Sequence, residues 1–463
     1  MNWIKKRARK PGRAAENRPE GPEALFAAPR LVEKPRAESR PEGAFPRFQA
    51  TASDELPIGN RDRFAAARLK LRKAYTPAQP ISDRQLFAGR RSLVATMIRA
   101  IEDERVHTIV YGQRGIGKTS LLQVIADAAR EARYVVSYAS CGATASFDET
   151  FRAIASDIPL MFHSAYGPKA AEAEQGGVFA DALRAGPVTP RLAADLCSKV
   201  TGTRVLVIVD EFDRCGSPEF RRDMAEFLKN LSDRSVRVQL LIAGVAENLD
   251  DLLETGALLQ RNVVALEVPQ MSDGEQRDLL NIGEQVSGLT FEPAAVELLI
   301  GATGGLPYVV SLLAQHAGLA ALSNGHMTVT AADLLAAIDQ AVLQMKGRIP
   351  RESLAHLSNL LRQRAESLIP VLASVARNAD GRFTQDDITA VSGGPLETAR
   401  ALTLLERLAR ECVLIQHDSE TAGHYRFIDP NIAPLLLLLA VRSVPEHGTG
   451  DAGAGKAKAA EVN

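Results

Sequence analysis

Short apolar runs alternate with longer amphipathic stretches through the middle of the chain. Helix-length segments, beginning near Lys118, Asp148 and Glu219, separate these runs, which read VHTIVY, YVVSYASC, VLVIVDEF, VQLLIAGV and VVALEV. Strands that alternate with helices usually pair in parallel, because each helix returns the chain to the starting edge of the sheet. The pattern predicts an α/β domain over residues 83–270, with a parallel sheet covered by helices on both faces.

The rest of the chain predicts two smaller domains. From Met271 to Met345 the apolar positions recur with helical periodicity only, which predicts an α-helical lid over residues 271–346. Residues 350–441 show three helical stretches followed by CVLIQH and HYRFID, which the turn-like DSETAG joins. Three helices followed by a hairpin predict a C-terminal winged-helix module.

Both ends of the chain have compositions that do not build a core. Residues 1–60 are rich in proline and charge and poor in large apolar side chains, so we expect a flexible tail. The first ten residues carry five Lys or Arg and no acid, which suits nucleic acid, an anionic membrane, an acidic partner or simply a solvated end. Residues 442–463 are rich in Gly and Ala, and we expect them to be flexible as well.

The overall composition narrows the class of protein. With 55 basic and 56 acidic residues the formal charge is −1, so no global field favours a nucleic acid or a membrane. The longest apolar run, Ala433–Val441, is too short to cross a bilayer, and no secretory signal is present. We therefore expect a cytoplasmic protein without a membrane span. The four cysteines, Cys141, Cys197, Cys215 and Cys412, lie far apart and include no Cys-x-x-Cys pair, which argues against a disulfide framework or a zinc site. Such a pattern suits a reducing compartment.

One glycine-rich stretch carries the clearest chemistry. The sequence IVYGQRGIGKTSLL contains the complete P-loop pattern, Gly-x-x-x-x-Gly-Lys-Thr, between a predicted strand and a predicted helix. Glycines let several backbone N–H groups approach phosphate oxygens, and the helix N-terminus favours the anion. We expect Lys118 to reach the β- and γ-phosphates and Thr119 to bind Mg²⁺. The predicted nucleotide-binding residues of this loop are Gly112, Gln113, Arg114, Gly115, Ile116, Gly117, Lys118, Thr119 and Ser120.

A second motif distinguishes a nucleotide hydrolase from a simple nucleotide binder. The apolar run Val205–Val209 leads directly into Asp210 and Glu211, which is the pattern of a Walker B strand. Asp210 is expected to hold Mg²⁺ through its water shell, and Glu211 to polarise the attacking water as general base. The chain has no Asn-Lys-x-Asp guanine motif, so the predicted cofactors are ATP and Mg²⁺ and the predicted activity is an ATPase.

With these motifs, residues 83–440 resemble AAA+ ATPases of the origin-recognition type and the related STAND-like ATPases of bacteria. Leu86–Arg90, LFAGR, is similar to the Phe-x-Gly-Arg box of such proteins, and Gly304–Pro307 looks like their Gly-x-Pro turn. The resemblance implies that the first segment contacts the adenine side of the nucleotide and that the second senses nucleotide from the lid. The residues it adds to the predicted nucleotide site are Phe87, Gly89, Arg90 and Pro307.

The same resemblance implies two further positions and marks two departures. Asn248 falls in the sensor 1 segment, although Ala243 and Gly244 end the preceding strand before any polar residue. Arg261 falls where an arginine finger acts on a neighbouring subunit, which implies a homo-oligomer. Pro307 stands where many AAA+ hydrolases have a sensor 2 arginine, which implies slow autonomous hydrolysis.

Three functions fit these features. The first is an ATP-driven conformational switch, in which nucleotide bound between the α/β domain and the helical lid sets the position of the winged helix and of assembly partners. The second is a DNA-handling ATPase, similar to initiators or transposition regulators, that uses the winged helix. The helix predicted over Pro395–Glu411 has three Arg and three Glu, so we expect residues 350–441 to bind duplex DNA weakly or not at all. The third is an ATP-binding scaffold without hydrolysis, which Glu211 disfavours.

Overall fold

The structure, a computed structural model, describes eleven stretches of the chain. They are residues 63–166, 176–183, 186–234, 237–246, 252, 263–362, 369–376, 382–392, 395–411, 414–417 and 423–443. The predicted tail at 1–60, most of the tail at 442–463, Asn248, Arg261 and Cys412 lie outside the described residues.

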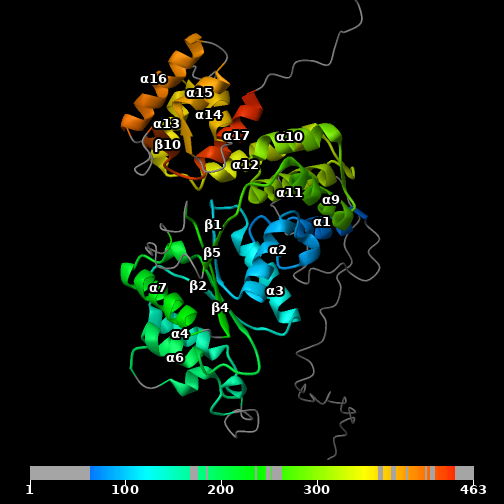
Figure 1. The fold of residues 1–463 in the computed structure, drawn as a ribbon. Helices are drawn as coiled ribbons and strands as arrows, with labels where there is room; N and C mark the ends of the chain where they lie inside the picture. Colours follow the sequence, from blue (N-terminus) through cyan, green and yellow to red (C-terminus); the bar gives the residue numbers. More distant parts are fainter. Residues whose placement is uncertain are drawn as a thin grey trace, which may run out of the picture. The chain divides into compact units, whose positions relative to one another are not determined.

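Five parallel strands form the central sheet, as the apolar runs predict (Figure 1). They pair in the order β2-β3-β4-β1-β5, so that the chain crosses over between strands that are distant in sequence. Every residue of β3 and β4 is buried, because the central strands of a parallel sheet are covered on both faces. The strands are β1 (His107–Tyr111), β2 (Val135–Ser140), β3 (Val205–Asp210), β4 (Val238–Gly244) and β5 (Val263–Glu267).

Helices cover both faces of this sheet and bury two separate apolar clusters. Leu206 and Ile208 of β3 pack with α2 (Arg91–Arg99) and α3 (Lys118–Glu131). The alternate β3 residues pack on the other face, against α4 (Phe147–Ser156), α6 (Pro190–Cys197) and α7 (Pro218–Asp233). The predicted architecture of this domain is therefore confirmed. Short helices connect its elements, namely η2 (Arg84–Leu86), η3 (Ala100–Glu104), η4 (Leu160–Phe162), η5 (Phe179–Ala182) and η6 (Phe212–Arg214).

The lid consists of helices, with one small interruption. Strands β6 (Thr290–Phe291) and β7 (Thr328–Val329) form a short parallel pair that the helical periodicity did not reveal. We use the name lid for residues 271–346. Its helices are α9 (Asp273–Ser287), α10 (Pro293–Thr303), α11 (Pro307–Ser323) and α12 (Ala331–Lys346).

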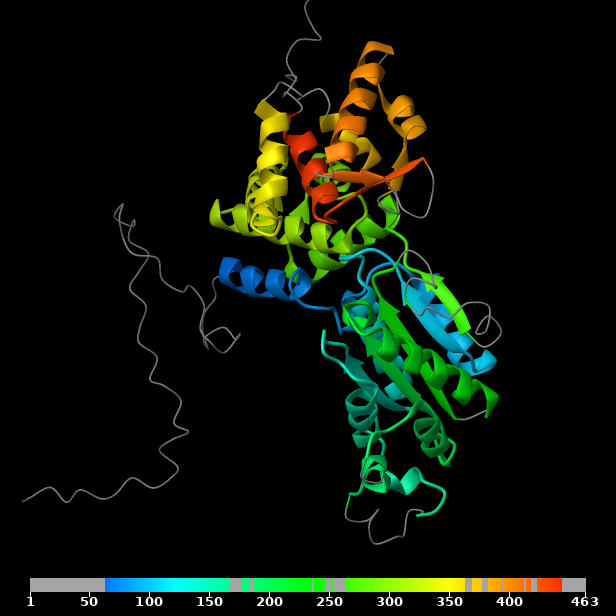
Figure 2. The same cartoon turned by 90° about the vertical axis from the view of Figure 1, so that its left-hand side faces the viewer.

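A helix before the predicted α/β domain, α1 (Arg63–Ala74), packs on α9 and α11 (Figure 2). The fully buried Tyr75 follows it and donates a hydrogen bond from its hydroxyl to the Leu280 carbonyl at 3.1 Å. Gly283 leaves room for this ring, since a Cβ there would lie 2.1 Å from it. Three buried positions in a basic helix give a weak sequence signal, and so the sequence pattern did not predict α1.

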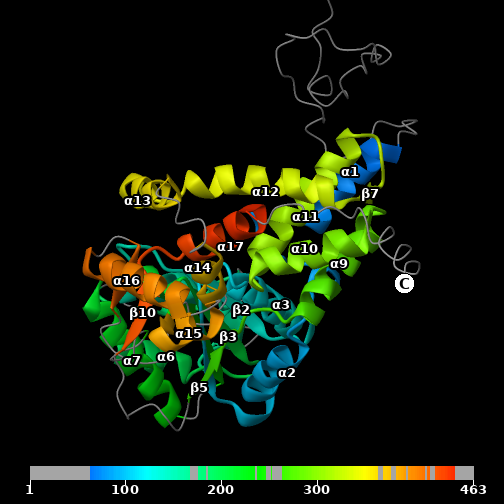
Figure 3. The same ribbon diagram turned by 90° about the horizontal axis from the view of Figure 1, so that it is seen from above.

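The C-terminal segment, residues 351–443, combines helices with a small antiparallel sheet in the order β8-β10-β9. Its last helix, α17, packs against α14, α10 and α12 (Figure 3). This packing explains the apolar run at Ala433–Val441, and no helix among the described residues is long and apolar enough to cross a membrane. The elements are α13 (Arg351–Arg362), α14 (Ile369–Val375), β8 (Arg382–Thr384), α15 (Gln385–Val391), α16 (Pro395–Glu411), β9 (Ile415–His417), β10 (His424–Phe427) and α17 (Ile432–Ser443).

One histidine is built into the sheet. His107 begins β1 and is 4% exposed, and its Nδ1 accepts a hydrogen bond from the backbone N–H of Leu240 at 3.0 Å. Burial lowers the pKa of His107 from 6.5 to about 4, because the charged imidazolium loses its hydration there. The neutral ring is the form that the fold accommodates.

We therefore expect acid to destabilise the fold through His107. Its folded pKa lies below its unfolded value, so its contribution is fully present above pH 6.5 and is lost as the pH falls toward 4. At pH 4.5 the expected loss is about 2 to 3 kcal/mol. Urea unfolding at pH 7 and pH 4.5 measures it, with His107→Asn as a non-titrating variant that keeps an acceptor. An equal loss of stability in both proteins would contradict this role.

Candidate nucleotide-binding site

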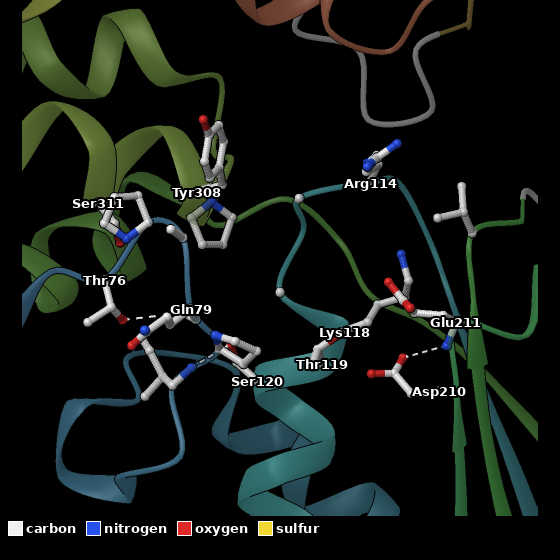
Figure 4. Close-up of a pocket in the computed structure, with 18 of the residues that line it drawn as sticks. Thr76, Gln79, Arg114, Lys118, Thr119, Ser120, Asp210, Glu211, Tyr308 and Ser311 are labelled. Carbon is white, nitrogen blue, oxygen red and sulfur yellow. Dashed lines mark hydrogen bonds between the residues drawn. The ribbon is translucent and has the colours of Figure 1, made fainter. Parts of the chain in front are cut away.

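A cavity of about 470 Å³ lies beside the N-terminus of α3 (Figure 4). Six parts of the chain line it: residues 76–81, the P-loop, the loop that follows β3, the loop that follows β4, the start of α11, and Pro430 between β10 and α17. A cavity of this size accommodates a small-molecule cofactor. Residues of the P-loop and of the Asp210–Glu211 motif therefore line the same cavity.

The P-loop connects β1 to α3 through a turn that only glycine fits. Gly112 has a φ of 143°, and a Cβ on it would lie 3.0 Å from the carbonyl oxygen of Val268. Ile116 is buried in the core next to the sheet and anchors the loop, while Gly115 and Gly117 line the cavity. Because α3 starts at Lys118, its unpaired N–H groups and the positive end of its dipole lie at the cavity, where they favour an anion.

Lys118 is held within the loop. Its ammonium donates hydrogen bonds to the carbonyl oxygens of Gly112 at 2.7 Å and Gln113 at 2.8 Å. Burial lowers its pKa from 10.5 to about 8, against the opposite effect of the Asp213 and Asp210 carboxylates. The side chain is charged at neutral pH and lines the cavity, where it can contact phosphate.

Asp210 ends β3 and is 4% exposed. One carboxylate oxygen accepts from the backbone N–H of Glu211 at 2.8 Å, and the other from the Tyr138 hydroxyl at 2.8 Å. The pKa of Tyr138 is raised, mainly by burial and in second place by this nearby carboxylate. Asp210 and Thr119 both line the cavity and present the carboxylate and hydroxyl oxygens that Mg²⁺ prefers.

Glu211 is positioned by strain and by two hydrogen bonds. Its backbone is left-handed, with a φ of 54°, which is uncommon for a residue other than glycine and typical of functional sites. Its Oε2 accepts from the Arg214 guanidinium at 2.8 Å and from the Ser140 hydroxyl at 3.1 Å. The Arg214 hydrogen bond is the main cause of a lowered Glu211 pKa. The carboxylate is thus ionised at the edge of the cavity.

Phe87, Gly89 and Arg90 do not line this cavity. Arg90 is 6% exposed and lies behind the P-loop, with a guanidinium nitrogen 3.0 Å from where a Cβ on Gly117 would be. Its backbone N–H donates to Glu275 at 2.7 Å, and its guanidinium donates to the Pro269 carbonyl at 3.0 Å. Arg90 therefore links the start of the lid to the P-loop, and the nucleotide contact implied for these three residues stays a prediction.

Residues 76–81 line the cavity and were missed by the sequence analysis. The backbone N–H of Ile81 donates to the Ser120 hydroxyl at 3.0 Å, and Gln315 of α11 donates to the Tyr75 carbonyl at 2.6 Å. The segment is thereby tied to both α3 and the lid. The two prolines of TPAQPI were the available signal, because proline ends helices and favours turns, and residues 77–79 form a turn.

The start of α11 brings the lid to the cavity. Pro307 lines the cavity where the Gly-x-Pro resemblance places it, and Tyr308 and Ser311 follow. Gly305 makes this approach possible, since a Cβ there would lie 2.5 Å from the Met271 carbonyl oxygen. After β4, the backbone N–H of Val245 donates to the Asp213 carboxylate at 2.7 Å, and both residues line the cavity.

Many solved structures are similar to this chain, and the three that follow share low sequence identity with it. The Walker-type ATPase of Pyrococcus abyssi is 19% identical with a TM-score of 0.45, covering 78% of this chain and 98% of its own. The Thermotoga maritima RuvB Holliday junction branch migration motor is 13% identical with a TM-score of 0.40, covering 75% and 95%. The Orc1 protein of Aeropyrum pernix, solved in complex with DNA, is 15% identical with a TM-score of 0.38, covering 80% and 95%.

The comparison with sequence families covers most of the chain. No curated protein is detectably similar in sequence. The profile of the family described as Novel STAND NTPase 1 matches residues 78–425, which include the P-loop, the Walker B strand, the lid and most of the C-terminal segment. The match begins within residues 76–81, which line the cavity, and ends in β10. The chain therefore belongs to the Novel STAND NTPase 1 family.

Proposed function

We propose that this protein is a conformational switch that binds and hydrolyses ATP. The observation that carries the proposal is the composition of the cavity wall, which joins the P-loop and Walker B residues to α11 of the lid and to Pro430 of the C-terminal segment. A nucleotide in this cavity contacts all three parts of the chain. ATP and ADP, which differ by one phosphate, can then favour different positions of the lid.

The residues of the site divide the chemistry among them. Lys118 and the N-terminus of α3 bind the β- and γ-phosphates. Thr119 and Asp210 hold Mg²⁺, which when bound neutralises charge on the phosphates. Glu211 accepts a hydrogen bond from the attacking water and orients it. Adenine is proposed as the base, because the sequence lacks a guanine motif.

Slow turnover is part of the proposal. Glu211 is engaged by Arg214 and Ser140, and its lowered pKa makes it a weaker base. The start of α11 has Pro307 rather than an arginine that could contact the γ-phosphate. We propose that Arg261 of a neighbouring copy supplies positive charge, so that assembly into a homo-oligomer accelerates hydrolysis.

The packing of the lid indicates how its movement is transmitted. A Cβ on Gly304, the residue that ends α10, would lie 2.6 Å from Leu437 of α17, so α10 and α17 are in close contact. Arg442 of α17 forms an ion pair with Asp339 of α12 at 2.9 Å. A lid that moves in response to nucleotide therefore moves α17 with it.

Two substitutions test this function in the full-length protein. We expect Lys118→Ala to weaken MgATP binding by about 100-fold, because the phosphate loses a charged donor. We expect Glu211→Gln to keep the affinity and to lower turnover by about 100-fold or more, since only the base is removed. Calorimetry and single-turnover hydrolysis measure these effects, with Glu102→Gln as a surface control. Wild-type affinity in a folded Lys118→Ala protein would refute the nucleotide site.

The pKa of Lys118 gives the binding a defined pH dependence. The free protein has this pKa at about 8, and phosphate favours the charged amine and raises it. Below pH 8 Lys118 is charged with or without nucleotide, whereas above pH 8 binding requires the uptake of a proton. We expect MgADP affinity to fall as the pH rises from 8 to 9.5. Calorimetry in buffers of different ionisation enthalpy should detect proton uptake at pH 9, and none at pH 9 would contradict the assignment.

The C-terminal segment supports binding of duplex DNA as a second candidate function. From α14 to β10 the elements follow the order helix, strand, helix, helix, strand, strand, and we propose that they form the predicted winged helix. Glu406 of α16 points inward and accepts hydrogen bonds from Tyr425 at 2.6 Å and Gln385 at 2.9 Å. Arg400, Arg407 and Arg410 are exposed. The charges of α16 sum to zero, yet its arginines face solvent, where they can contact DNA phosphates.

A salt titration distinguishes this second candidate from a solvated helix face. We expect the full-length double variant Arg400→Gln/Arg407→Gln to bind a 30-base-pair duplex more weakly and to reduce the slope of log affinity against log salt by about 2. Fluorescence anisotropy measures both quantities, and MgATP affinity should not change. The matched control is Arg130→Gln/Arg277→Gln, which neutralises two exposed arginines elsewhere. Equal salt slopes for the two double variants would contradict a DNA contact by the arginines of α16.

A further inference from the structure

Tyr308 stands where the lid meets the P-loop. It is the second residue of α11, and its Cβ lies 3.6 Å from where a Cβ on Gly115 would be. Pro307 before it lies 3.8 Å from the corresponding position on Gly117. Figure 4 shows the Tyr308 ring rising from the start of α11, with its hydroxyl directed away from the P-loop. The base of this side chain thus lines the cavity, while its hydroxyl points elsewhere.

The hydroxyl is bound by an arginine from the connection between the lid and the C-terminal segment. Arg348 donates a hydrogen bond from its guanidinium to the Tyr308 hydroxyl, and its guanidinium carbon lies 5.1 Å from the centre of the ring. Residues 347–350 join α12 to α13. Two contacts, one polar and one cation–π, therefore link a cavity residue to this connection.

The connection itself is fixed to the helices on either side. The backbone N–H of Arg348 donates to the Met345 carbonyl at 3.0 Å, and Leu354 of α13 donates to the Pro350 carbonyl at 3.1 Å. Ile349 between them is 5% exposed and belongs to the apolar core of the lid. A displacement of Arg348 therefore moves the end of α12 and the start of α13, rather than a free loop.

We propose that Arg348 is a positioning residue that holds Tyr308 against the P-loop and couples nucleotide binding to the α12–α13 connection. The inference rests on the proposed nucleotide switch and names the contact through which the cavity and the C-terminal segment communicate. Coupling between two sites is reciprocal, so whatever the nucleotide does to this connection, the connection does to nucleotide affinity. A Tyr308 released from Arg348 leaves the cavity wall less ordered, and MgADP then binds more weakly.

Two conservative variants of the full-length protein test the coupling. Tyr308→Phe keeps the ring and removes the hydroxyl, and Arg348→Gln keeps most of the side chain and removes the charge. We expect each variant to weaken MgADP binding by about three- to tenfold, and the double variant to be no weaker than either, because both remove the same contact. Arg348→Lys, which keeps a charged donor, should recover part of the affinity. The matched control is Arg277→Gln, which removes an exposed arginine ion pair to Glu297 without touching Tyr308.

Hydrogen exchange supplies a measurement that a merely structural role would not affect. In the wild-type protein we expect MgADP to slow amide exchange in residues 345–354 at least threefold. We expect this change to disappear in Tyr308→Phe and Arg348→Gln but not in Arg277→Gln. Additive losses of affinity, or an undiminished exchange response in both variants, would overturn the inference and leave the proposed function standing. Failure of the wild-type protein to bind MgADP would overturn both.

Discussion

The turn between β1 and α3 is the constraint around which the rest of the structure is arranged. Backbone N–H groups must converge on one point, and this requires a chain without side chains at its closest approaches. Gly112 lies against the carbonyl of Val268, and the backbone N–H of Val268 in turn donates to the Tyr111 carbonyl at 2.9 Å. The turn is thus fixed to the end of β5, from which the chain continues directly into the lid.

The electrostatics of the site follow from the same position. Lys118 is buried beside the carboxylates of Asp213 and Asp210, and the ionised carboxylate of Glu211 is paired with Arg214. Burial disfavours the lysine charge and the nearby acids favour it, so the pKa falls only to about 8. The lysine therefore keeps its charge at neutral pH, and bound phosphate increases the preference for that charged form.

The lid and the C-terminal segment share one apolar core, whereas the sheet has cores of its own. Leu71 of α1, Leu313 of α11 and Leu437 of α17 belong to a single buried cluster, and two other clusters cover the faces of the sheet. The cavity lies where the parts built on these separate cores meet. Movement at such a boundary disturbs less packing than movement within a core, which suits a switch.

The sequence by itself determined the five parallel strands, the helices on both sides of them and the places of the P-loop and of Asp210 and Glu211 at the ends of strands. These features depend on local periodicity and on backbone chemistry at fixed spacing, so they are visible in a linear pattern. Only the tertiary structure decided which distant segments meet. Residues 76–81 line the cavity because Tyr75 is buried in the lid, and Arg90 contacts Glu275 rather than the cavity. Likewise, Glu406 of α16 faces inward, whereas Arg400 and Arg407 face solvent. The net charge of the helix sums these residues without regard to direction. It could not predict this arrangement, because the electrostatic effect of a side chain depends on where it lies in space.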